Sequence, residues 1–583
     1  MSLLICYATE TGNAEDVGEM LWREARRRGC KSPRMASFEQ LSLESLASER
    51  TVVFLIATSG QGEFPTSARS LWTCFRQKIL PNDYMDKMHF SVVALGDSSY
   101  QKYNRAGRLL RARLVQLGAH QLCPPAYCDD QHEIGIDGAF QPWKHVFFEA
   151  LKGVEGFERI LDSKDPELSE RPFVSKFRLR FCDGEHIDEP SGSAEYVRVE
   201  TISNERQTSI DHFQDTRLIT FNIGNHEEAL RYRSGDVLMI QPENLDESIK
   251  IAVEALKLSD ETLDRPFKLE PTDSNIRLPP GWLIGTTTSL RYCLKRVLDL
   301  QHIPKKSFFE ILSRISKDED EAERLAEFCQ PENLDLFLDY TLKTRRTAAE
   351  AFRDFYRTAS QLSHEQLFDV LPLIRPRAFS IASSPMAHPG VIQLLVAKVE
   401  YKPPIAKMAD LRRGLCSCHL TRLRHGDMVF VRIRDGTFHF PSPETPIICI
   451  GPGTGVAPFR SVINDRLRIH PDSESLLFFG CRGRFSDYYF EIEWTHLEKP
   501  RIFVAFSRDQ EHKIYVQHLL KKEAALIWRL LQQGAYIFVA GSAGEMPNGV
   551  CEMLGEIGKE IGGEENLVKT LETQGRLQFE TWS

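Results

Sequence analysis

The sequence predicts a multidomain α/β protein, in which a doubly wound domain is followed by a β-barrel and a second α/β domain. The chain has 583 residues, which is enough for about three or four domains of ordinary size. Apolar runs alternate with helical patterns near both ends of the chain, and this alternation favours buried parallel sheets there. Runs with strand character dominate the centre, which favours a barrel.

The first 150 residues contain repeated strand–helix units. Three of their apolar runs are apolar throughout, as expected of strands buried on both faces of a parallel sheet, and a fourth run is weaker. This repetition predicts a doubly wound domain over residues 1–150. The runs are 3–8, 51–58, 89–95 and, more weakly, 121–128, and the helical patterns include 14–28 and 101–117.

A polar and charged segment follows this domain, and we interpret residues 151–171 as an interdomain linker. Residues 172–440 read as strands, except for a helical stretch over about 245–370. This order predicts a β-barrel that is interrupted by a helical insertion. The predicted barrel strands are 173–181, 195–202, 216–223, 237–241, 377–382, 391–400 and 428–434, and the predicted inserted helices include 318–328 and 348–362.

The last part of the chain, residues 441–583, returns to apolar runs that are each followed by a turn. This pattern predicts the second α/β domain, of the kind that binds nucleotides. The turn after its first run is rich in glycine, at 451–458, which taken alone is a weak signal for nucleotide binding. The apolar runs are 446–450, 475–480, 501–507 and 535–540.

Composition and charge exclude several classes of protein. With 42% hydrophobic and 27% charged residues, the chain is neither collagenous, disordered nor a coiled coil. The net charge of −9 argues against nucleic-acid binding. No apolar run approaches the roughly 18 residues that a membrane span needs, so we expect no membrane anchor. The 13 cysteines include no C-x-x-C pair, so we expect a reducing compartment and no metal site.

Polar loops follow three of the N-terminal runs, at the edge where open parallel sheets bind ligands. The first loop, 8–14 (Ala-Thr-Glu-Thr-Gly-Asn-Ala), leads into a helix, so its backbone N–H groups and hydroxyls predict a phosphate cradle. Taken alone, this loop is also compatible with an ordinary helix cap. Two more loops at the same edge, 57–63 and 95–104, strengthen the prediction of a ligand site.

Two further groups of residues predict contacts with phosphate. The motif at 375–380 (Arg-Pro-Arg-Ala-Phe-Ser) contains guanidinium groups, which match phosphate oxygens bidentately. Near the C-terminus, Ser507, Arg508 and Lys513 offer donors for a 2′-phosphate. No acidic residue directly ends the preceding strand, as an NAD site would prefer, and although Asp509 comes next, Arg508 favours NADPH.

In this order, the loops and motifs resemble those of the diflavin reductases over essentially the whole chain. That family joins a flavodoxin-like FMN domain to a ferredoxin–NADP reductase-like module, which consists of an FAD-binding barrel with a helical insertion and an NADPH-binding domain. Four features resemble in particular the NADPH-dependent diflavin oxidoreductases of cytosolic iron–sulfur protein assembly, which are similar to the microsomal cytochrome reductase and the sulfite reductase flavoprotein. These features are Gly-Asp-Ser-Ser-Tyr at 96–100, Asp-Asp-Gln-His at 129–132, the motif at 375–380 and the Glu-Thr-Trp ending at 580–582.

The resemblance implies which residues bind each cofactor. The FMN residues would be Thr9, Glu10, Thr11, Gly12, Asn13, Ala14, Ala57, Thr58, Ser59, Gly60, Leu95, Gly96, Asp97, Ser98, Ser99, Tyr100, Gln101, Lys102, Tyr103, Asn104 and Asp130. The FAD residues would be Arg345, Arg377, Ala378, Phe379, Ser380, Gly414, Leu415, Cys416, Ser417 and Trp582. The NADPH residues would be Thr454, Ser507, Arg508, Lys513, Ile514, Tyr515, Val516 and Gln517.

The same resemblance implies roles for single side chains. Tyr100 would stack on the FMN ring, and Tyr515 would stack on the adenine of NADPH. Ser380 and Glu580 would be catalytic, in the transfer from NADPH to FAD. Trp582 would cover the FAD ring and move aside to admit NADPH. A cysteine, Cys481, would lie near the nicotinamide.

Several positions depart from the family pattern. Ser59 and Gly60 stand where a second aromatic residue often covers FMN. Phe379 replaces a tyrosine and keeps its packing without the hydroxyl. Ala540 stands where a cysteine is common, and Glu580 stands where an aspartate is usual. We expect a slower transfer rather than its loss, because positioning supplies most of the effect.

The resemblance implies that electrons pass from NADPH through FAD and FMN to a one-electron acceptor, an anamorsin-type iron–sulfur protein. Two alternatives stay open: a haem protein or a sulfite reductase haemoprotein as the acceptor, and a non-catalytic scaffold that has lost a flavin. We expect a monomer or a transient heterocomplex in the cytoplasm, with nuclear or mitochondria-associated pools also open. Acidic residues cluster in the FMN-side loops of this chain, and we expect this acidic face to attract a basic patch on the acceptor. The residues of the acidic face are Glu63, Asp97, Asp129, Asp130 and Glu133.

Overall fold

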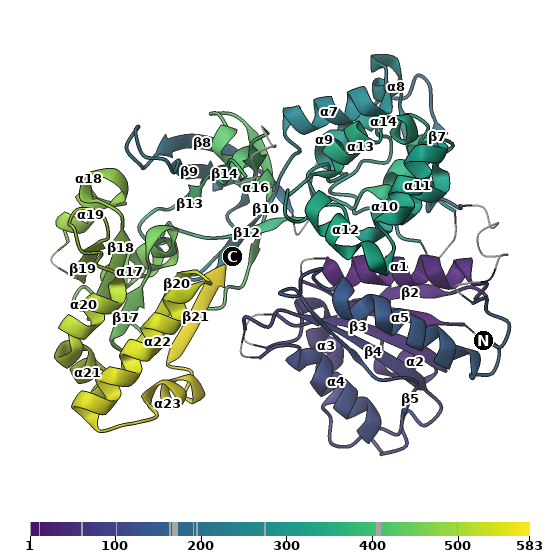
Figure 1. Cartoon of the computed structure of the whole chain (residues 1–583). Coiled ribbons are helices and arrows are strands. Elements are labelled where there is room, and N and C mark those ends of the chain that lie inside the picture. Colours follow the sequence, from purple (N-terminus) through teal and green to yellow (C-terminus); the bar gives the residue numbers. More distant parts are fainter. Residues whose placement is uncertain are drawn as a thin grey trace. The chain divides into compact units, whose positions relative to one another are not determined.

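The computed structural model describes residues 2–10, 12–59, 62–100, 102–162, 165, 173–190, 192–193, 196–272, 276–403, 410–497 and 499–582 (Figure 1). It comprises two compact units. The first contains the N-terminal domain and the inserted helices, and the second contains the barrel and the C-terminal domain. The first unit consists of Met1–Asp188, Asp246–Pro280 and Thr286–Arg375, and the second of Glu189–Leu245, Gly281–Gly285 and Pro376–Ser583.

The first unit is built around a parallel sheet with the strand order β2-β1-β3-β4-β5, and β6 also pairs with β4. In β1, Ile5 and Tyr7 pack into one core, whereas Leu4 and Cys6 pack into another on the opposite face. Burial on both faces explains why these runs are apolar throughout, and the strand order confirms the doubly wound fold. The strands are β1 (Leu4–Ala8), β2 (Arg34–Ser37), β3 (Thr51–Ala57), β4 (His89–Gly96), β5 (His120–Gln121) and β6 (Ala126–Asp129).

Helices cover both faces of this sheet. Helices α1 and α5 contribute to the core that contains Ile5, and α3 and α4 contribute to the core that contains Leu4. Strand β2 has no signal in the sequence, because it is a short and half-buried edge strand. The helices are α1 (Asn13–Arg27), α2 (Leu43–Ala47), α3 (Thr66–Phe75), α4 (Arg105–Gln116) and α5 (Asp137–Lys152).

The segment predicted as the start of the linker belongs instead to the core of the N-terminal domain. Val154, Phe157 and Ile160 are buried in the same cluster as Ile5. Apolar side chains at every third position give this segment a face that packs, which a solvated linker lacks. Residues 163, 164 and 166–171 of the predicted linker lie outside the described residues.

The inserted helices and a two-stranded sheet complete the first unit. The run predicted to begin the barrel at 173–181 forms β7 (Phe177–Phe181), which pairs with β11 (Phe267–Pro271) in this unit, so its assignment to the barrel is wrong. Phe177 meets Phe368 edge to face, which directs this strand toward the helices. The helices are α7 (Asp246–Leu256), α8 (Asp260–Asp264), α9 (Leu290–Arg296), α10 (Lys306–Ile315), α11 (Glu319–Glu327), α12 (Leu334–Tyr340), α13 (Ala348–Asp354), α14 (Tyr356–Ala359) and α15 (His364–Val370).

The second unit contains the predicted barrel. Its strands follow the order β12-β10-β16-β8-β9-β13, and a bridge between Ile381 and Leu394 brings the two ends of this order together. Both residues are fully buried in a core that the strands share. Helix α16 (Leu415–Arg422) packs on the same core. The strands are β8 (Val197–Arg206), β9 (Thr216–Asn222), β10 (Val237–Gln241), β12 (Arg377–Ser380), β13 (Val391–Ala397) and β16 (Met428–Arg434).

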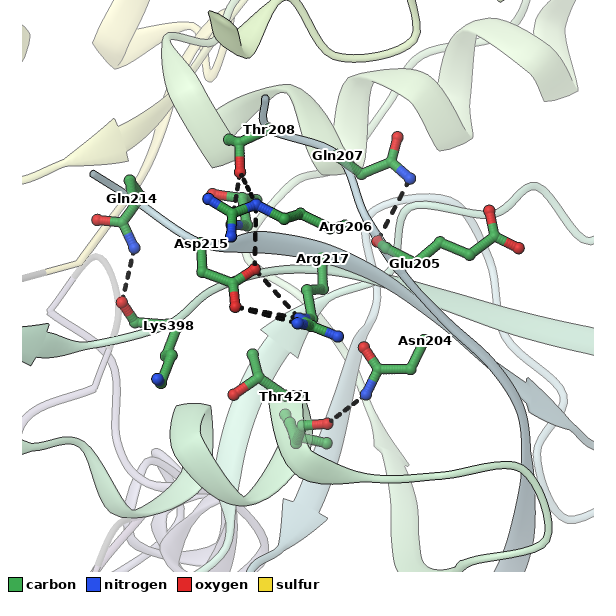
Figure 2. Close-up of polar contacts among 12 residues, drawn as sticks. Asn204, Glu205, Arg206, Gln207, Thr208, Gln214, Asp215, Arg217, Lys398 and Thr421 are labelled. Carbon is green, nitrogen blue, oxygen red and sulfur yellow. Dashed lines mark hydrogen bonds and ion pairs between the residues drawn. The ribbon is translucent and has the colours of Figure 1, made fainter. Parts of the chain in front are cut away.

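Side chains of the β8–β9 hairpin hold α16 in place, as Figure 2 shows. Asn204 donates hydrogen bonds to the carbonyl oxygens of Leu420 and Leu423, at 3.0 and 2.9 Å, near the end of α16. Gln214 donates to the carbonyl of Lys398 at 2.6 Å, just after β13. The barrel therefore holds the last turn of α16 and the segment just after β13.

The C-terminal domain has a parallel sheet with the order β19-β18-β17-β20-β21. Strand β21 was not predicted, because it is a half-buried edge strand with only Leu577 fully inside. The strands are β17 (Ile447–Ile450), β18 (Ser475–Cys481), β19 (Arg501–Phe506), β20 (Tyr536–Ser542) and β21 (Leu577–Trp582). The longer helices are α17 (Ala457–Ile469), α20 (Val516–Lys522), α21 (Ala524–Gln532), α22 (Glu545–Ile557) and α23 (Leu567–Thr573), and two shorter helices, α18 (Arg484–Asp487) and α19 (Glu491–Thr495), follow β18.

No helix in the described part of the chain combines the length and the apolar character that a membrane crossing requires.

Candidate cofactor sites

The loop between β1 and α1 has the backbone of a phosphate cradle. Gly12 adopts a left-handed conformation with a φ of 97°, and its N–H donates to Oγ1 of Thr9 at 2.8 Å. Among the described residues no side chain caps α1, so N–H groups of its first turn point out of the helix end. The carboxylate of Glu10 accepts bonds from the N–H and hydroxyl of Thr66, so it supports the start of α3. Thr11 lies outside the described residues.

Hydrogen bonds from backbone and side-chain groups bring the other predicted FMN loops to the same edge of the sheet. The N–H of Thr58 donates to the carbonyl of Leu95 at 2.9 Å. The N–H of Ser98 donates to Oδ1 of Asp129 at 2.9 Å, and Asn104 donates to the carbonyl of Cys128 at 3.0 Å. These bonds join the loops after β3, β4 and β6 into one edge.

Some of the predicted residues serve this framework rather than a ligand. The side chains of Leu95 and Asn104 are buried within the domain, and the hydroxyl of Tyr103 donates to the carbonyl of Tyr127 at 2.9 Å. Any contact with a cofactor from Leu95 or Asn104 would come from the backbone. Gly60 and Gln101 lie outside the described residues. The remaining predicted residues at this edge are Ala57, Gly96, Asp97, Ser99, Lys102 and Asp130.

The composition of this edge suits a flavin. The hydroxyls of Thr58 and Ser59 are buried and have no hydrogen-bond partner among the described residues. Buried polar groups are almost always paired in a complete structure, so a polar ring at this place would satisfy them. The ring of Tyr100, which is predicted to stack on FMN, is 39% exposed.

Carboxylates around this edge make it acidic. Burial acts to raise the pKa of Asp129, but hydrogen bonds from Ser98 and Gln131 prevail and lower it. The pKa of Asp130 is raised, first by burial and then by the nearby Asp97. Glu63 pairs with Arg69 at 3.1 Å on the exposed surface. Asp129 therefore carries its charge more readily than its neighbour does.

A second site lies in the second unit, where the barrel meets the sheet of the C-terminal domain. Ser380, the last residue of β12, donates a hydrogen bond to Oε1 of Glu580 in β21. Thr437 donates to the other oxygen, Oε2, at 2.9 Å. Ala540 pairs with Glu580 in the register of β20 and β21, so the predicted position of the missing thiol lies beside this carboxylate.

Burial and these two hydroxyls act in opposite directions on the pKa of Glu580. Burial is the largest influence and raises the pKa of its carboxyl group, while the hydrogen bonds from Ser380 and Thr437 oppose that rise. The structure thus brings together Ser380 and Glu580, which the motifs placed in one site. It also adds Thr437, for which the sequence contains no signal. Trp582 lies two residues further along β21, pairs with Ser542 and is 37% exposed.

The predicted FAD residues of the motif at 375–380 and those at 414–417 lie on the barrel. Arg377 and Ala378 are exposed on β12, where they pair with Ile240 and Met239 of β10, and Phe379 packs against the barrel core. The predicted FAD residues at 414–417 form the start of a helix, with Gly414 as the N-cap of α16.

The first turn of α16 has donors to offer. No side chain caps it, so the N–H groups near Leu415, Cys416 and Ser417 are available to an anion. Burial raises the pKa of Cys416 to about 12, and the positive charge of Arg377 opposes that rise, which places the guanidinium near this turn. A guanidinium next to a helix N-terminus suits a pyrophosphate. Arg345 has a left-handed backbone in the first unit, and its contact with FAD stays a prediction.

The glycine turn after β17 packs closely against β20. A Cβ atom on Gly455 would lie 2.8 Å from the carbonyl carbon of Ala540, so this position requires glycine. Thr454 lies in the same turn, which leads into α17. Cys481 ends β18 in the interior, where burial raises the pKa of its thiol.

The residues predicted to recognise the 2′-phosphate follow β19. The N–H of Ser507 donates to the carbonyl of Cys481 at 2.9 Å, and the N–H of Arg508 to that of Arg482 at 2.8 Å. The carboxylate of Asp509 accepts a bond from the N–H of Arg484 at 2.9 Å. Asp509 is therefore engaged with the turn after β18, and Arg508 remains the charged group to expect at the ribose.

The segment at 513–517 is divided between the surface and the core. Tyr515 is 42% exposed, and Lys513 and Ile514 lie on the surface as well. Val516 is buried in the core of the C-terminal domain, so any contact of this residue with NADPH would come from its backbone. Gln517 lies beside Gly549 of α22. The described residues contain no cluster of possible metal ligands.

Comparison with known proteins identifies three domains and full-length relatives. Family models match for flavodoxin at residues 5–143, an FAD binding domain at 190–419 and an oxidoreductase NAD-binding domain at 449–552. The chain is 38% identical to NADPH-dependent diflavin oxidoreductase 1 of Bos taurus and 37% identical to that of Danio rerio, each alignment covering 100% of this chain and 99% of the relative. It is 32% identical to the protein of the same name from Schizosaccharomyces pombe, with the same coverage. These matches confirm the flavodoxin-like domain and the ferredoxin–NADP reductase-like module.

Proposed function

Because the chain belongs to the NADPH-dependent diflavin oxidoreductases, which use FMN, FAD and NADPH, we propose that it passes electrons from NADPH to a one-electron acceptor protein. The observation that best supports this route is the hydrogen bond between Ser380 and Glu580, two residues 200 positions apart in the sequence. A reductase needs a polar site where its flavin-binding barrel meets its nucleotide-binding sheet. This hydrogen bond lies at such a place.

Each cofactor has a candidate set of holding groups. The loop between β1 and α1 would hold the phosphate of FMN, and Arg377 with the first turn of α16 would hold the pyrophosphate of FAD. Arg508 and Ser507 would hold the 2′-phosphate of NADPH. When bound, the two flavins supply the conversion of a two-electron donation into single-electron steps.

The protein's own contribution near the nicotinamide would be orientation. Glu580 accepts the hydrogen bond of Ser380 and so directs the hydroxyl proton of that residue toward β21. Thr437 fixes the second carboxylate oxygen, so the carboxylate cannot rotate without losing a bond. Trp582 would exclude water from the flavin and yield its place to NADPH.

We propose an anamorsin-type iron–sulfur protein of cytosolic iron–sulfur assembly as the acceptor. The acidic residues around the FMN edge support an acceptor with a basic patch, since opposite charges steer association. Reduction of the acceptor should then weaken as the ionic strength rises, because exposed charges are screened.

An absorption spectrum of the purified chain tests the proposed route. We expect two flavins per chain, FMN and FAD in equal amounts, and bleaching of both by NADPH. Release of the flavins by denaturation and their separation by chromatography gives the stoichiometry. A colourless protein, or one flavin only, would favour a scaffold that has lost a cofactor and would contradict the proposal.

A comparison of purified acceptors tests the proposed partner. We expect NADPH-dependent reduction of an anamorsin-type protein to be faster than that of a haem protein, measured from the absorbance of each acceptor at matched concentrations. Neutralising two exposed residues of the acidic face that are not predicted to bind FMN, with Glu133→Gln and Glu63→Gln, should slow the first reaction and leave ferricyanide reduction unchanged. Faster reduction of the haem protein would overturn the assignment of the acceptor.

A further inference from the structure

Opposite charges join the first turn of α1 to the end of the helical insertion within the first unit. Nη2 of Arg375 lies 2.8 Å from Oε2 of Glu15 and 3.3 Å from Oδ1 of Asp16. Nζ of Lys305 lies 3.8 Å from Oδ2 of Asp16. The side chains of Arg375, Glu15 and Asp16 are each only about a quarter exposed, so solvent screens them incompletely.

Arg375 also lies against the loop proposed to hold the FMN phosphate. A Cβ atom on Gly12 would lie 2.7 Å from Cζ of Arg375, closer than any side chain could come. The bare backbone of Gly12 therefore lets the guanidinium approach the loop. The left-handed φ of 97° is a second reason for glycine at this position.

The charge balance of the loop gives this approach a purpose. Residues 8–16 contain Glu10, Glu15 and Asp16 but no lysine or arginine, so they carry a formal charge of −3. The phosphate of FMN is an anion, and carboxylates in the first turn of the helix repel it. Backbone N–H groups offer hydrogen bonds there, but no side chain of the loop offers a positive charge. Arg375 brings one from the helical insertion.

An alternative is that Arg375 only stabilises the contact between the insertion and α1. Other pairs at the same interface would do that equally well: Lys176 lies 2.7 Å from Glu19, and Arg23 donates to the carbonyl of Asp369 at 2.9 Å. Glu19 and Arg23 lie one and two turns further along α1 than the acidic pair, away from the loop. If adhesion were the purpose, loss of Lys176 would have the same consequence as loss of Arg375.

We propose that Arg375 is a positioning residue for the phosphate of FMN, which the helical insertion supplies to the flavodoxin-like domain. Arg375 offsets the negative charges of Glu15 and Asp16 beside the loop, so that the backbone N–H groups can bind the phosphate anion. This inference rests on the proposed FMN site between β1 and α1. By thermodynamic linkage, bound FMN in turn strengthens the contact between the insertion and α1.

The test compares two ligands that differ only in the phosphate. Full-length chain stripped of FMN is titrated with FMN and with riboflavin, and the quenching of ligand fluorescence gives each affinity. We expect Arg375→Ala to weaken FMN binding about tenfold or more, as the loss of a charged partner requires, and to leave riboflavin binding unchanged. Lys176→Ala is the matched control and should change FMN binding by less than about threefold.

A rescue experiment separates charge cancellation from other causes. In the Arg375→Ala background, Glu15→Gln together with Asp16→Asn should restore most of the lost affinity for FMN. Arg375→Lys, which keeps the charge, should retain most of it from the start. Unchanged riboflavin binding shows that the FMN site of each variant is folded.

Three results would overturn the inference: unchanged FMN affinity in Arg375→Ala, equal losses for FMN and riboflavin, or an equal loss in Lys176→Ala. Failure of the proposed function is a different result, because the wild-type chain itself would then bind no FMN.

Discussion

Replacing Glu580 by Gln is expected to slow the reduction of the bound flavin by NADPH about a hundredfold, at the lower end of what a positioned acid–base group contributes. Each oxygen of the carboxylate accepts a hydrogen bond from one hydroxyl, that of Ser380 or that of Thr437. A glutamine has an NH₂ group in place of one of these oxygens, so it cannot accept both bonds in the same way. Ser380→Ala should have a similar effect, since it removes the group that Glu580 directs. Rapid mixing with NADPH under anaerobic conditions measures this rate.

The pH dependence of that rate should carry the signature of Glu580. Burial raises the pKa of its carboxyl group above the ordinary value of about 4.3. The rate should therefore fall as the pH drops through this raised pKa, because the protonated group no longer accepts both bonds. Glu580→Gln should remove this limb of the profile, since an amide does not titrate there.

A serine in the same barrel supplies the control. Ser203 donates to Oγ1 of Thr220 at 3.1 Å, and Ser203→Ala should leave the reduction rate and its pH profile unchanged. A carboxyl group with a raised pKa stabilises the fold only at low pH, and that contribution is lost as the pH rises through its pKa. Glu580→Gln should therefore unfold at no lower a temperature than wild type at neutral pH. An unaltered rate in Glu580→Gln would contradict the role of the pair.

Replacing Arg508 by Ala should reduce the preference for NADPH over NADH by about a hundredfold, because a guanidinium meets a phosphate with two charge-assisted hydrogen bonds. The loss should appear in kcat/KM for NADPH, while the value for NADH stays near that of wild type. Asp509 should not improve the use of NADH by binding its free 2′-hydroxyl, since the carboxylate of Asp509 already accepts a hydrogen bond from the N–H of Arg484. Steady-state kinetics with both nucleotides and ferricyanide as the acceptor give the two values.

The matched control for this change lies at the other end of the same strand. Arg501 is exposed at the start of β19, whereas Arg508 follows its end. Arg501→Ala should leave the ratio of the two kcat/KM values unchanged. If Arg508→Ala lowered the values for NADPH and NADH equally, the residue would act on folding or on the shared part of the nucleotide.

How far the sequence predicts each element depends on burial. The runs at 3–8 and 51–58 are enclosed by side chains on both faces, and such strands leave an uninterrupted apolar record. The edge strands β2 and β21 are half-buried, so their residues mix polar and apolar types and resemble loops. The segment 153–160 resembled a linker for the related reason that only every third residue is apolar.

The same reasoning applies to the sites. Ser380 and Arg377 could be found because they belong to a contiguous motif, and Glu580 because it precedes a recognisable ending. Thr437 could not be assigned, since it acts on a residue far away in the chain and carries no local pattern of its own. Arg375 belongs to the same motif as Arg377, but the motif does not reveal its contacts with Glu15 and Asp16. The sequence did not show that the side chain of Val516 enters the core while that of its neighbour Tyr515 is exposed.

The sequence alone determined the order of the domains, the family and the cofactors, because each of these is written in short runs whose residues act together locally. Only the tertiary structure decided which groups meet. It shows that Glu580 accepts a hydrogen bond from Ser380, that Asp509 accepts one from the N–H of Arg484, and that Arg375 lies against the loop between β1 and α1. The physical reason is that a hydrogen bond or an ion pair depends on atoms a few ångströms apart in space. Chain positions hundreds of residues apart do not record that distance.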